Sequence, residues 1–342
     1  MTDLSSQQLV TLINQASDQD SLWFVDEATD IACLASVLPR ENLTLISNRF
    51  ELHQQAIMLG LNSSFSDFDV AIEQQFQQLF LRIAKEKPIV HFIINRSAEL
   101  LVREGVLTLI GEKSDGTKTY IDKAKKFLGS SATAKKNNII YTGQIRRYSP
   151  GTPLPDKGYD KLQPIEGDFF SKPGVFGWNK VDQGSAYLIE QLEELLKQYK
   201  VKTGATLLDL GCGYGYLSVL ANKISNFKIT ATDNNAVALC CCEHNFEQQQ
   251  INGRVLASHV GNTIDERFDL ILCNPPFHTG FDTDVDLTPL FLQQAKDHLK
   301  SDGLAVFVVN SFIPLETKAE GVFGKIDIVA RNKQFKVVAL SR

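Results

Sequence analysis

One tetrapeptide in this sequence, Asn274-Pro275-Pro276-Phe277, combines residue types suited to holding a planar amine. Each proline fixes its own φ at about −65° and restricts the preceding residue to extended backbone. The side-chain oxygen of Asn274 and the carbonyl of Pro275 are then held as a rigid pair of acceptors, and Phe277 can stack on a base. An aryl amine is a weak nucleophile because its lone pair is delocalised into the ring. If both N–H bonds are accepted, that lone pair turns toward an incoming methyl group, so the motif predicts methyl transfer to an amine by positioning and electrostatics.

A second motif, Asp209-Leu210-Gly211-Cys212-Gly213-Tyr214-Gly215, follows an apolar run and precedes a helical pattern. Glycines permit positive φ and let a ligand lie against the backbone at the carboxyl end of a strand, where open αβ sheets bind ligands. A dinucleotide site would need a glycine at position 216, where this chain has Tyr216. Asp209 also places negative charge beside the turn, which suits a sulfonium and an ammonium better than a pyrophosphate. The turn therefore predicts S-adenosylmethionine as the ligand.

Polar residues at the next strand ends can contact the same ligand. Asp233 and Asn234 end the following predicted strand, roughly 20 residues after the turn, where an acidic side chain accepts from ribose hydroxyls. The alternative for Asp233 is a helix N-cap. Ser258 and His259 end the third strand and can face the adenine. Cys273 lies before the tetrapeptide on an apolar strand, so we expect it in the core and not as a nucleophile.

These motifs lie in a half of the chain where short apolar runs alternate with helical patterns. Strands that are apolar throughout and separated by helices predict an α/β fold with a doubly wound, largely parallel sheet, as in Rossmann-like methyltransferase domains. The predicted strands are 206–210, 228–232, 254–257, 268–273 and 304–309, with a hairpin at 326–330 and 335–340, and the predicted helices are 181–200, 214–224, 236–249 and 288–299.

The first half repeats this rhythm and predicts a second domain of related architecture. The turn after its first strand, residues 26–30, contains no glycine, so we expect this domain to be degenerate and unable to bind the ligand. Residues 149–174 are rich in proline and glycine and predict a linker. The domains expected are 1–148, a linker at 149–172, and a catalytic domain at 173–342. In the first half, the predicted strands are 21–25, 43–46, 89–94, 106–110 and 138–141, and the predicted helices are 6–15, 28–38, 50–58, 71–84 and 119–128.

Composition limits the class of protein. The chain has 342 residues, 43% of them hydrophobic, and a net charge of −5. No apolar run approaches the roughly 20 residues needed to cross a bilayer, and the N-terminus lacks a secretory signal, so we expect a cytoplasmic protein without membrane contact. The six cysteines have no metal-ligand spacing, which predicts no metal site.

One stretch of the first half is locally basic and can face RNA, although a solvated helix face is the alternative. Within it, only Glu112, Asp115 and Asp122 are acidic. Its basic residues are Lys113, Lys118, Lys123, Lys125, Lys126, Lys135, Lys136, Arg146 and Arg147.

With both motifs in place, the chain resembles the two-domain bacterial 16S ribosomal RNA guanine-N2 methyltransferases of the guanine-1207 type. The resemblance spans nearly the whole length and is strongest from Lys172 through the glycine turn to the tetrapeptide and His278. It implies a duplicated methyltransferase fold whose N-terminal copy has lost cofactor binding and supports RNA contact. It also implies action on guanine 1207 in the assembled 30S subunit, by a monomer that does not use DNA. The target guanine must leave its stack to be reached.

The resemblance also implies roles for individual residues. It assigns enclosure of the cofactor's methionine end to Phe176, Asp182, Gly184 and Ser185, and the lining below the cofactor to Gly211, Cys212 and Gly213. It implies that Asp233 binds the ribose and that Asn274, Pro275 and Phe277 bind the guanine amine. His259 departs from the family pattern, in which asparagine is usual at this position.

Four other functions remain open from the sequence. The chain could methylate another amine, such as a guanine in 23S rRNA, adenine N6, or glutamine N5 in a protein. The enzymes for the latter two usually carry tyrosine where this chain has Phe277, and a DNA enzyme needs a larger insertion than residues 280–304 allow. The chain could also be a non-catalytic RNA-binding assembly factor, although the intact Asp209, Asp233 and Asn274 weigh against that.

Overall fold

A computed structural model describes residues 3–84, 86–276 and 287–342. The chain divides into two compact units, Met1–Lys161 and Leu162–Arg342, so the division falls inside the segment predicted as a linker. In the described ranges, no helix is both long and apolar enough to span a bilayer.

The first unit consists of four helices, a 3-10 helix and seven strands within its described residues. In chain order these are α1 (Leu4–Gln15), β1 (Ser21–Val25), η1 (Ile31–Ser36), β2 (Leu43–Ser47), α2 (Phe50–Met58), β3 (Asn62–Phe65), β4 (Phe76–Arg82), α3 (Lys87–Leu100), β5 (Leu101–Glu112), α4 (Thr117–Leu128), β6 (Lys135–Asn137) and β7 (Ile140–Arg146).

The second unit begins with a small hairpin and continues with a second αβ pattern. Its elements are β8 (Gln163–Ile165), β9 (Phe169–Ser171), α5 (Gln183–Gln198), β10 (Thr206–Leu210), α6 (Tyr216–Ile224), β11 (Lys228–Asp233), α7 (Ala236–Gln248), β12 (Arg254–Ala257), β13 (Phe268–Cys273), α8 (Thr288–His298), β14 (Leu299–Asn310), α9 (Leu315–Ala319), β15 (Lys325–Arg331) and β16 (Phe335–Ser341).

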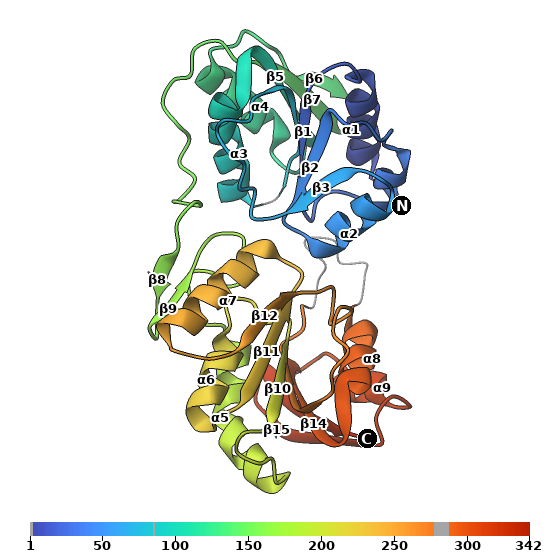
Figure 1. The fold of residues 1–342 in the computed structure, drawn as a ribbon, viewed down its shortest axis with the longest axis vertical. Coiled ribbons are helices and arrows are strands. Elements are labelled where there is room, and N and C mark those ends of the chain that lie inside the picture. Colours follow the sequence, from blue (N-terminus) through green and yellow to red (C-terminus); the bar gives the residue numbers. More distant parts are fainter. Residues whose placement is uncertain (1–2, 85, 277–286) are drawn as a thin grey trace. The chain divides into compact units, whose positions relative to one another are not determined.

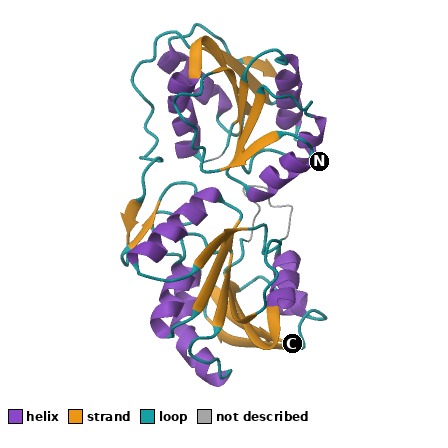
Figure 2. Ribbon diagram, viewed as in Figure 1, coloured by secondary structure: helices purple, strands orange, loops and turns teal. Residues whose placement is uncertain are grey.

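The two units contain seven-stranded sheets of the same topology. The strand orders are β3-β2-β1-β4-β5-β7-β6 and β12-β11-β10-β13-β14-β16-β15, and in each sheet one strand, β7 or β16, runs antiparallel to its neighbours. Helices α5, α6 and α7 cover one face of the second sheet, and α8 and α9 cover the other (Figure 1, Figure 2). In the first unit, α3 and α4 lie on the face opposite α1 and α2. The predicted pair of related α/β domains is therefore confirmed.

Apolar central strands account for this layering. All five residues of β1 are buried, and so are the last four of β10, because helices cover both faces. The pairing of β4 with β5 and that of β13 with β14 show the same irregularity at the start of each strand pair. Gly105 and Gly303 stand at matching positions there, where an added Cβ would lie 3.0 and 2.8 Å from Leu101 and Leu299. The shared detail indicates that the two units are copies of one fold.

Two segments of the first unit have the opposite element type from the prediction. Residues 89–94, predicted as a strand, belong to helix α3, which has a proline in its first turn and is buried on most sides. Residues 71–84, predicted as a helix, include β4, which lies between β1 and β5. Residues 89–94 and 79–81 are short, almost fully buried apolar runs, and periodicity cannot separate a helix from a strand in such a run.

The first part of the predicted linker packs on α3. Asn95 holds it with three hydrogen bonds: its Nδ2 donates to the carbonyl of Leu154 at 2.9 Å and to Asp156 Oδ2 at 3.2 Å, and its Oδ1 accepts from the backbone N–H of Leu154 at 2.8 Å. Tyr159 is fully buried, packs against Phe92 in a tilted arrangement with ring centroids 4.8 Å apart, and donates to Asp67 at 2.6 Å. Residues 154–159 are therefore part of the first unit.

Candidate functional site

The glycine turn and the first residues of the tetrapeptide lie at the same edge of the second sheet. β10 and β13 are parallel neighbours, with Asp209 paired to Leu272, so the glycine turn and Asn274 both follow carboxyl ends of adjacent strands. This is the edge at which open αβ sheets bind ligands. Phe277 lies outside the described residues, and its stacking role stays a prediction.

The side-chain amide of Asn274 has a fixed orientation. Its Nδ2 donates to Asp182 Oδ2 and to Ser185 Oγ, both at 2.8 Å. An ionised carboxylate is an acceptor only, so it binds the NH₂ end of the amide and not the carbonyl end. Because both N–H groups are used in this way, Oδ1 is the end of the Asn274 side chain that remains to accept from a substrate.

Helix α5 supplies these two acceptors. Asp182 is its N-cap and accepts from the backbone N–H of Ser185 at 2.7 Å, which fixes both residues relative to the helix. Gly184 lies between them, where an added Cβ would be 3.1 Å from Asp182 Oδ2 and 3.1 Å from the ring of Phe335. The structure thus brings Asp182, Gly184 and Ser185 to Asn274. Their predicted role around the cofactor stays a prediction.

The glycine turn has the backbone that its sequence predicted. Gly211, Gly213 and Gly215 all have positive φ, at 82°, 54° and 86°. The N–H of Gly213 donates to Asp233 Oδ2 at 2.9 Å, and a Cβ added at Gly213 would meet no atom within 4 Å. The backbone of the turn is therefore open to a ligand at Gly213, as an S-adenosylmethionine site requires.

Asp209 lies beneath this turn and is fully buried. Its Oδ2 accepts from the N–H and hydroxyl of Ser218, at 3.0 and 2.6 Å, which ties β10 to helix α6. Burial raises the pKa of Asp209 to about 6, although the Ser218 hydrogen bonds oppose the shift and the charge of Asp233 adds to it. These contacts support the turn, while direct cofactor binding by Asp209 stays a prediction.

Asp233 ends β11 and faces the same turn. Its Oδ1 accepts from the N–H of Asn235 at 2.9 Å, whereas the N-cap of α7 is Asn235 itself, through a bond from Val237. The alternative role for Asp233 as an N-cap is therefore wrong. Asp233 is half-buried, as is its neighbour Asn234, so both are partly accessible at the carboxyl edge.

Three further predicted residues lie around this edge. Ser258 is buried, and its backbone N–H donates to the carbonyl of Asp233 at 2.9 Å. This bond brings the half-buried His259 beside the end of β11. Phe176 is 82% exposed, in a segment joined to α7 by the bond from Asn235 Nδ2 to the carbonyl of Gly174 at 2.8 Å. Sequence reasoning missed Asn235, whose position before a helical run was the available signal.

The cysteines near the site are buried. Cys212 has its N–H bonded to the carbonyl of Thr232 at 2.9 Å, and its side chain is 7% exposed. Cys273 is completely buried, as expected of a core residue, and burial and the charge of Asp209 raise its thiol pKa. Neither thiol suits nucleophilic catalysis. No cluster of metal-ligating side chains occurs among the residues that the structure describes.

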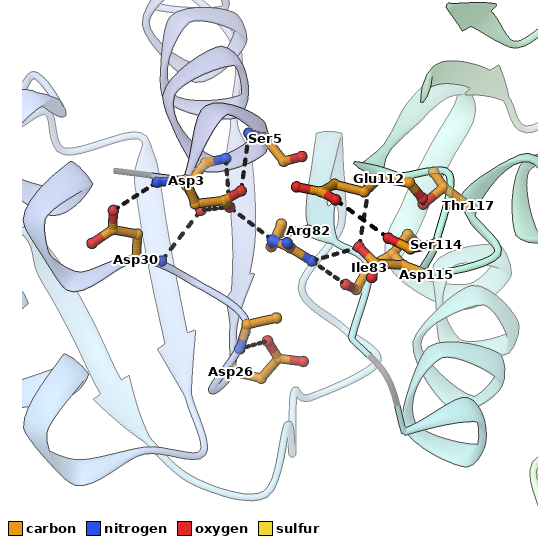
Figure 3. A network of polar contacts seen from close by, with 12 residues as sticks. Asp3, Ser5, Asp26, Asp30, Arg82, Ile83, Glu112, Ser114, Asp115 and Thr117 are labelled. Carbon is orange, nitrogen blue, oxygen red and sulfur yellow. Dashed lines mark hydrogen bonds and ion pairs between the residues drawn. The ribbon is translucent and has the colours of Figure 1, made fainter. Parts of the chain in front are cut away.

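The first unit has a related constellation at the corresponding edge. The shared strand register places Arg82 where the second unit has Asn274, and the N-cap of α1 is Asp3 where that of α5 is Asp182. Arg82 Nε donates to Asp3 Oδ2 at 2.9 Å (Figure 3). Ser6 Oγ donates to the same oxygen at 2.6 Å. In both units, therefore, an N-cap aspartate binds the side chain at the carboxyl end of the central strand, and a serine three residues later binds that aspartate.

The difference between the two edges is chemical. Arg82 also forms an ion pair with Asp115 at 3.1 Å. Burial alone would lower the pKa of Arg82, but the hydrogen bond to Asp3 and the charges of Asp3 and Asp115 raise it above the usual value. Asp26, in the turn after β1, is buried, and its pKa is raised to about 6 by burial and by Glu27. A guanidinium that can only donate stands where the second unit offers an amide oxygen, so this edge cannot hold an amine in the same way.

The basic stretch of the first unit covers α4 and the strands at one sheet margin. Lys123 is half-buried, with Nζ 3.3 Å from His91 Nε2 and 5.8 Å from the ring centre of Tyr120. β6 is the edge strand, and all three of its residues are exposed. The exposed basic residues are Lys113, Lys118, Lys126, Lys135, Lys136 and Arg146.

The second unit matches a known family of methyltransferase domains. Residues 166–339, about half of the chain, match the family described as the methyltransferase small domain. A solved structure titled T. thermophilus 16S rRNA N2 G1207 methyltransferase, in complex with AdoMet and guanosine, is similar in fold with a TM-score of 0.82. It is 21% identical in sequence, and the match covers 99% of this chain and 92% of that chain.

Proteins of similar sequence share one name, which identifies the family more closely. "Ribosomal RNA small subunit methyltransferase C" of Aeromonas hydrophila subsp. hydrophila is 30% identical over 275 residues, covering 77% of this chain and 76% of the relative. The protein of the same name in Shewanella loihica is 25% identical over 343 residues, covering 98% and 95%. The chain belongs to the ribosomal RNA small subunit methyltransferase C family.

Proposed function

We propose that this protein transfers a methyl group from S-adenosylmethionine to the exocyclic N2 amine of guanine 1207 in 16S ribosomal RNA. The observation that carries the amine chemistry is the orientation of Asn274, whose NH₂ group is bound by Asp182 and Ser185. The names of the relatives and of the solved structure support the ribosomal substrate. We further propose a cytoplasmic monomer that acts on the small ribosomal subunit.

The residues at the carboxyl edge fit S-adenosylmethionine. The open backbone at Gly213 accommodates a ligand against the turn, and the Asp233 carboxylate lies beside it to accept from ribose hydroxyls. When bound, S-adenosylmethionine supplies an electrophilic methyl group with a neutral thioether as its leaving group. Phe176, Gly211, Cys212 and His259 are proposed to complete the enclosure of the cofactor.

The chain's own residues supply orientation. Asn274 Oδ1 and the carbonyl of Pro275 accept the two N–H bonds of the guanine amine, which draws the nitrogen toward a tetrahedral geometry and frees its lone pair. Because Asp182 and Ser185 fix the amide before substrate arrives, no reorientation is needed at the moment of transfer. Phe277 is proposed to stack on the guanine and exclude water.

Replacement of Asn274 tests this function. Asn274→Ala should lower the turnover of small subunits at least 100-fold, the loss typical of a removed transition-state contact, and leave S-adenosylmethionine binding by calorimetry within about twofold. Asn222→Ala, on α6 where Asn222 caps the Phe227 backbone, is the matched control and should behave as wild type. Wild-type turnover of Asn274→Ala would refute the amine-binding role.

The substrate is tested in cells. Nucleoside mass spectrometry of ribosomal RNA from cells lacking this gene should show loss of N2-methylguanosine at one small-subunit site. Unchanged modification of the small-subunit RNA would exclude the proposed substrate, whatever the outcome for Asn274. A methylated adenine or a methylated glutamine lost instead would select one of the alternatives.

A further inference from the structure

Phe312 is an exposed aromatic side chain at the edge that holds the proposed site. It is 82% exposed, a value that only Phe176 matches among the large apolar side chains of the described residues. Exposed aromatic rings beside a basic surface are a common means of binding unpaired nucleotides. Such a role requires that the backbone around Phe312 be fixed and that positive charge lie nearby to bind phosphates.

The strand register places Phe312 close to Asn274. β14 is the parallel neighbour of β13, and Phe307 pairs with Cys273, the residue before Asn274. β14 ends at Asn310, so the Phe312 segment leaves the same sheet edge one strand away. Neighbouring strands are about 4.8 Å apart, and Phe312 lies four residues further along the strand direction than Asn274, at most about 13 Å at 3.3 Å per residue, so the segment is within reach of the RNA strand next to a guanine bound at Asn274.

The backbone on both sides of Phe312 is fixed. The N–H of Ser311 donates to the carbonyl of Gln334 at 2.8 Å, and the N–H of Ile313 donates to the carbonyl of Asn310 at 3.0 Å. Ile313 packs against the core, and Leu315 is fully buried. The exposed ring therefore projects from an anchored loop, so binding a base would require little additional ordering of the chain.

The adjacent hairpin turn adds positive charge. Arg331 donates to the carbonyl of Ser311 at 3.2 Å, which joins the turn between β15 and β16 to the Phe312 loop. Lys333 is exposed at the tip of this turn, and the nearby carboxylate of Glu316, whose charge interacts with Arg331, is paired with Lys336. A ring beside two cations, with the neighbouring carboxylate already in an ion pair, matches an RNA strand, which pairs stacking bases with phosphates.

We infer that Phe312, Arg331 and Lys333 form a platform for the RNA strand next to the methylated guanine, with Phe312 stacking on a neighbouring base. This inference rests on the proposed function. A guanine that leaves its stack exposes the faces of its neighbours, and a fixed aromatic ring one strand from Asn274 replaces part of the lost stacking. The platform therefore contributes RNA affinity and leaves the chemical step to Asn274.

Steady-state methylation of small subunits from cells lacking this gene tests the platform. Phe312→Ala should raise the KM for subunits roughly 5- to 150-fold, the loss expected for one stacked base, with kcat and S-adenosylmethionine affinity within about twofold of wild type. Phe312→Tyr should restore the KM. Ile328→Ala, which truncates a 45% exposed side chain on β15, is the control and should match wild type.

Salt dependence tests the basic part of the platform. In filter binding of the same subunits, Lys333→Gln should reduce the slope of log affinity against log salt by about 0.7, the value for one phosphate contact on a single strand. Phe312→Ala should leave that slope unchanged, because stacking releases no counterions.

The outcomes separate the two proposals. Equal KM values for Phe312→Ala and Ile328→Ala would overturn the platform, as would a loss of S-adenosylmethionine affinity, which would place the ring over the cofactor. If the wild-type protein transferred no methyl group to subunits, the proposed function would fail. Filter binding without cofactor would still show whether Phe312→Ala weakens RNA binding, so the platform would be judged by itself.

Discussion

The orientation of Asn274 can be perturbed without touching Asn274. Asp182→Ser keeps a good N-cap residue on α5, since serine and aspartate cap helices about equally well. The serine side chain is one atom shorter, so it no longer accepts from Asn274 Nδ2, which lies 2.8 Å from the Asp182 carboxylate. We expect the amide of Asn274 to keep only its bond to Ser185, whose hydroxyl can donate as well as accept and so does not enforce one orientation.

The size of the effect follows from the contact that is lost. A hydrogen bond to a charged group contributes about 1.5–3 kcal/mol, and about 1.4 kcal/mol corresponds to a tenfold change in rate. Asp182 and Asn274 are both half-buried, so water partly screens the interaction and the lower end applies. We therefore expect Asp182→Ser to lower kcat by about tenfold. Ser185→Ala removes a neutral acceptor and should lower kcat by roughly two- to tenfold.

Single-turnover methylation and calorimetry together form the assay. If Asp182 acts through Asn274, the rate of methyl transfer falls while the Kd for S-adenosylmethionine stays within about twofold. Asp269→Asn is the matched control, because Asp269 lies at the opposite end of β13 and accepts from Thr206 and Lys300 at 2.7 and 2.9 Å. It should lower stability and leave the transfer rate unchanged.

Three results would refute this reasoning. An unchanged transfer rate in Asp182→Ser would mean that Asn274 needs no support. A loss of rate matched by a loss of S-adenosylmethionine affinity would assign Asp182 to the cofactor, as the family resemblance implies. An equal loss of rate in Asp269→Asn would point to general destabilisation of the second unit.

The remaining predictions concern the turn, the first unit and the basic surface. Gly213→Ala should weaken S-adenosylmethionine binding at least tenfold in calorimetry, because it adds a Cβ where the turn is open, whereas Gly204→Ala has a similar positive φ outside the site and should lower only stability, by about 1 kcal/mol. Burial raises the pKa of Asp26 to about 6, above its unfolded value, so its contribution to stability is complete below about pH 4 and is lost as the pH rises through 6. Asp26→Asn should therefore stabilise the first unit progressively above pH 4, by up to roughly 3 kcal/mol at pH 8, in hydrogen exchange of β1; a pH-independent difference would contradict this. Charge reversal at the exposed Lys126 and Lys136 should weaken RNA binding most at low salt, and unchanged binding would assign them to solvation.

The sequence predicted the second unit well because its signals are local. The strands 206–210, 254–257 and 268–273 have the predicted bounds, and the glycine turn has the expected positive φ values. Each of these features depends on a short stretch of chain, such as an apolar run or a turn whose positive φ values favour glycine. The first unit was harder, since α3 and β4 are buried on most sides and their periodicity carries little information.

The support of Asn274 could not be predicted from residues alone. Asp182 and Ser185 lie about 90 positions earlier in the chain, at separations of 92 and 89 residues, and the contact depends on how α5 packs beside β14. A helix N-cap was a readable signal at Asp182, but its second role needs the tertiary structure. The same holds for Phe312, whose exposure and anchored backbone appear only once β14 and the β15–β16 turn are placed.

The duplicated constellation shows which position decides the chemistry of each unit. Asp3 binds Arg82 as Asp182 binds Asn274, and Ser6 binds Asp3, so an aspartate at a helix N-cap is the support common to both copies of the fold. An amide bound through its nitrogen presents an oxygen, and that oxygen can accept from an amine. A guanidinium bound in the same way presents only further donors, and here they satisfy Asp115 and a backbone carbonyl. One side chain at the carboxyl end of the central strand therefore separates an edge that can hold an amine from an edge stabilised by its own ion pairs.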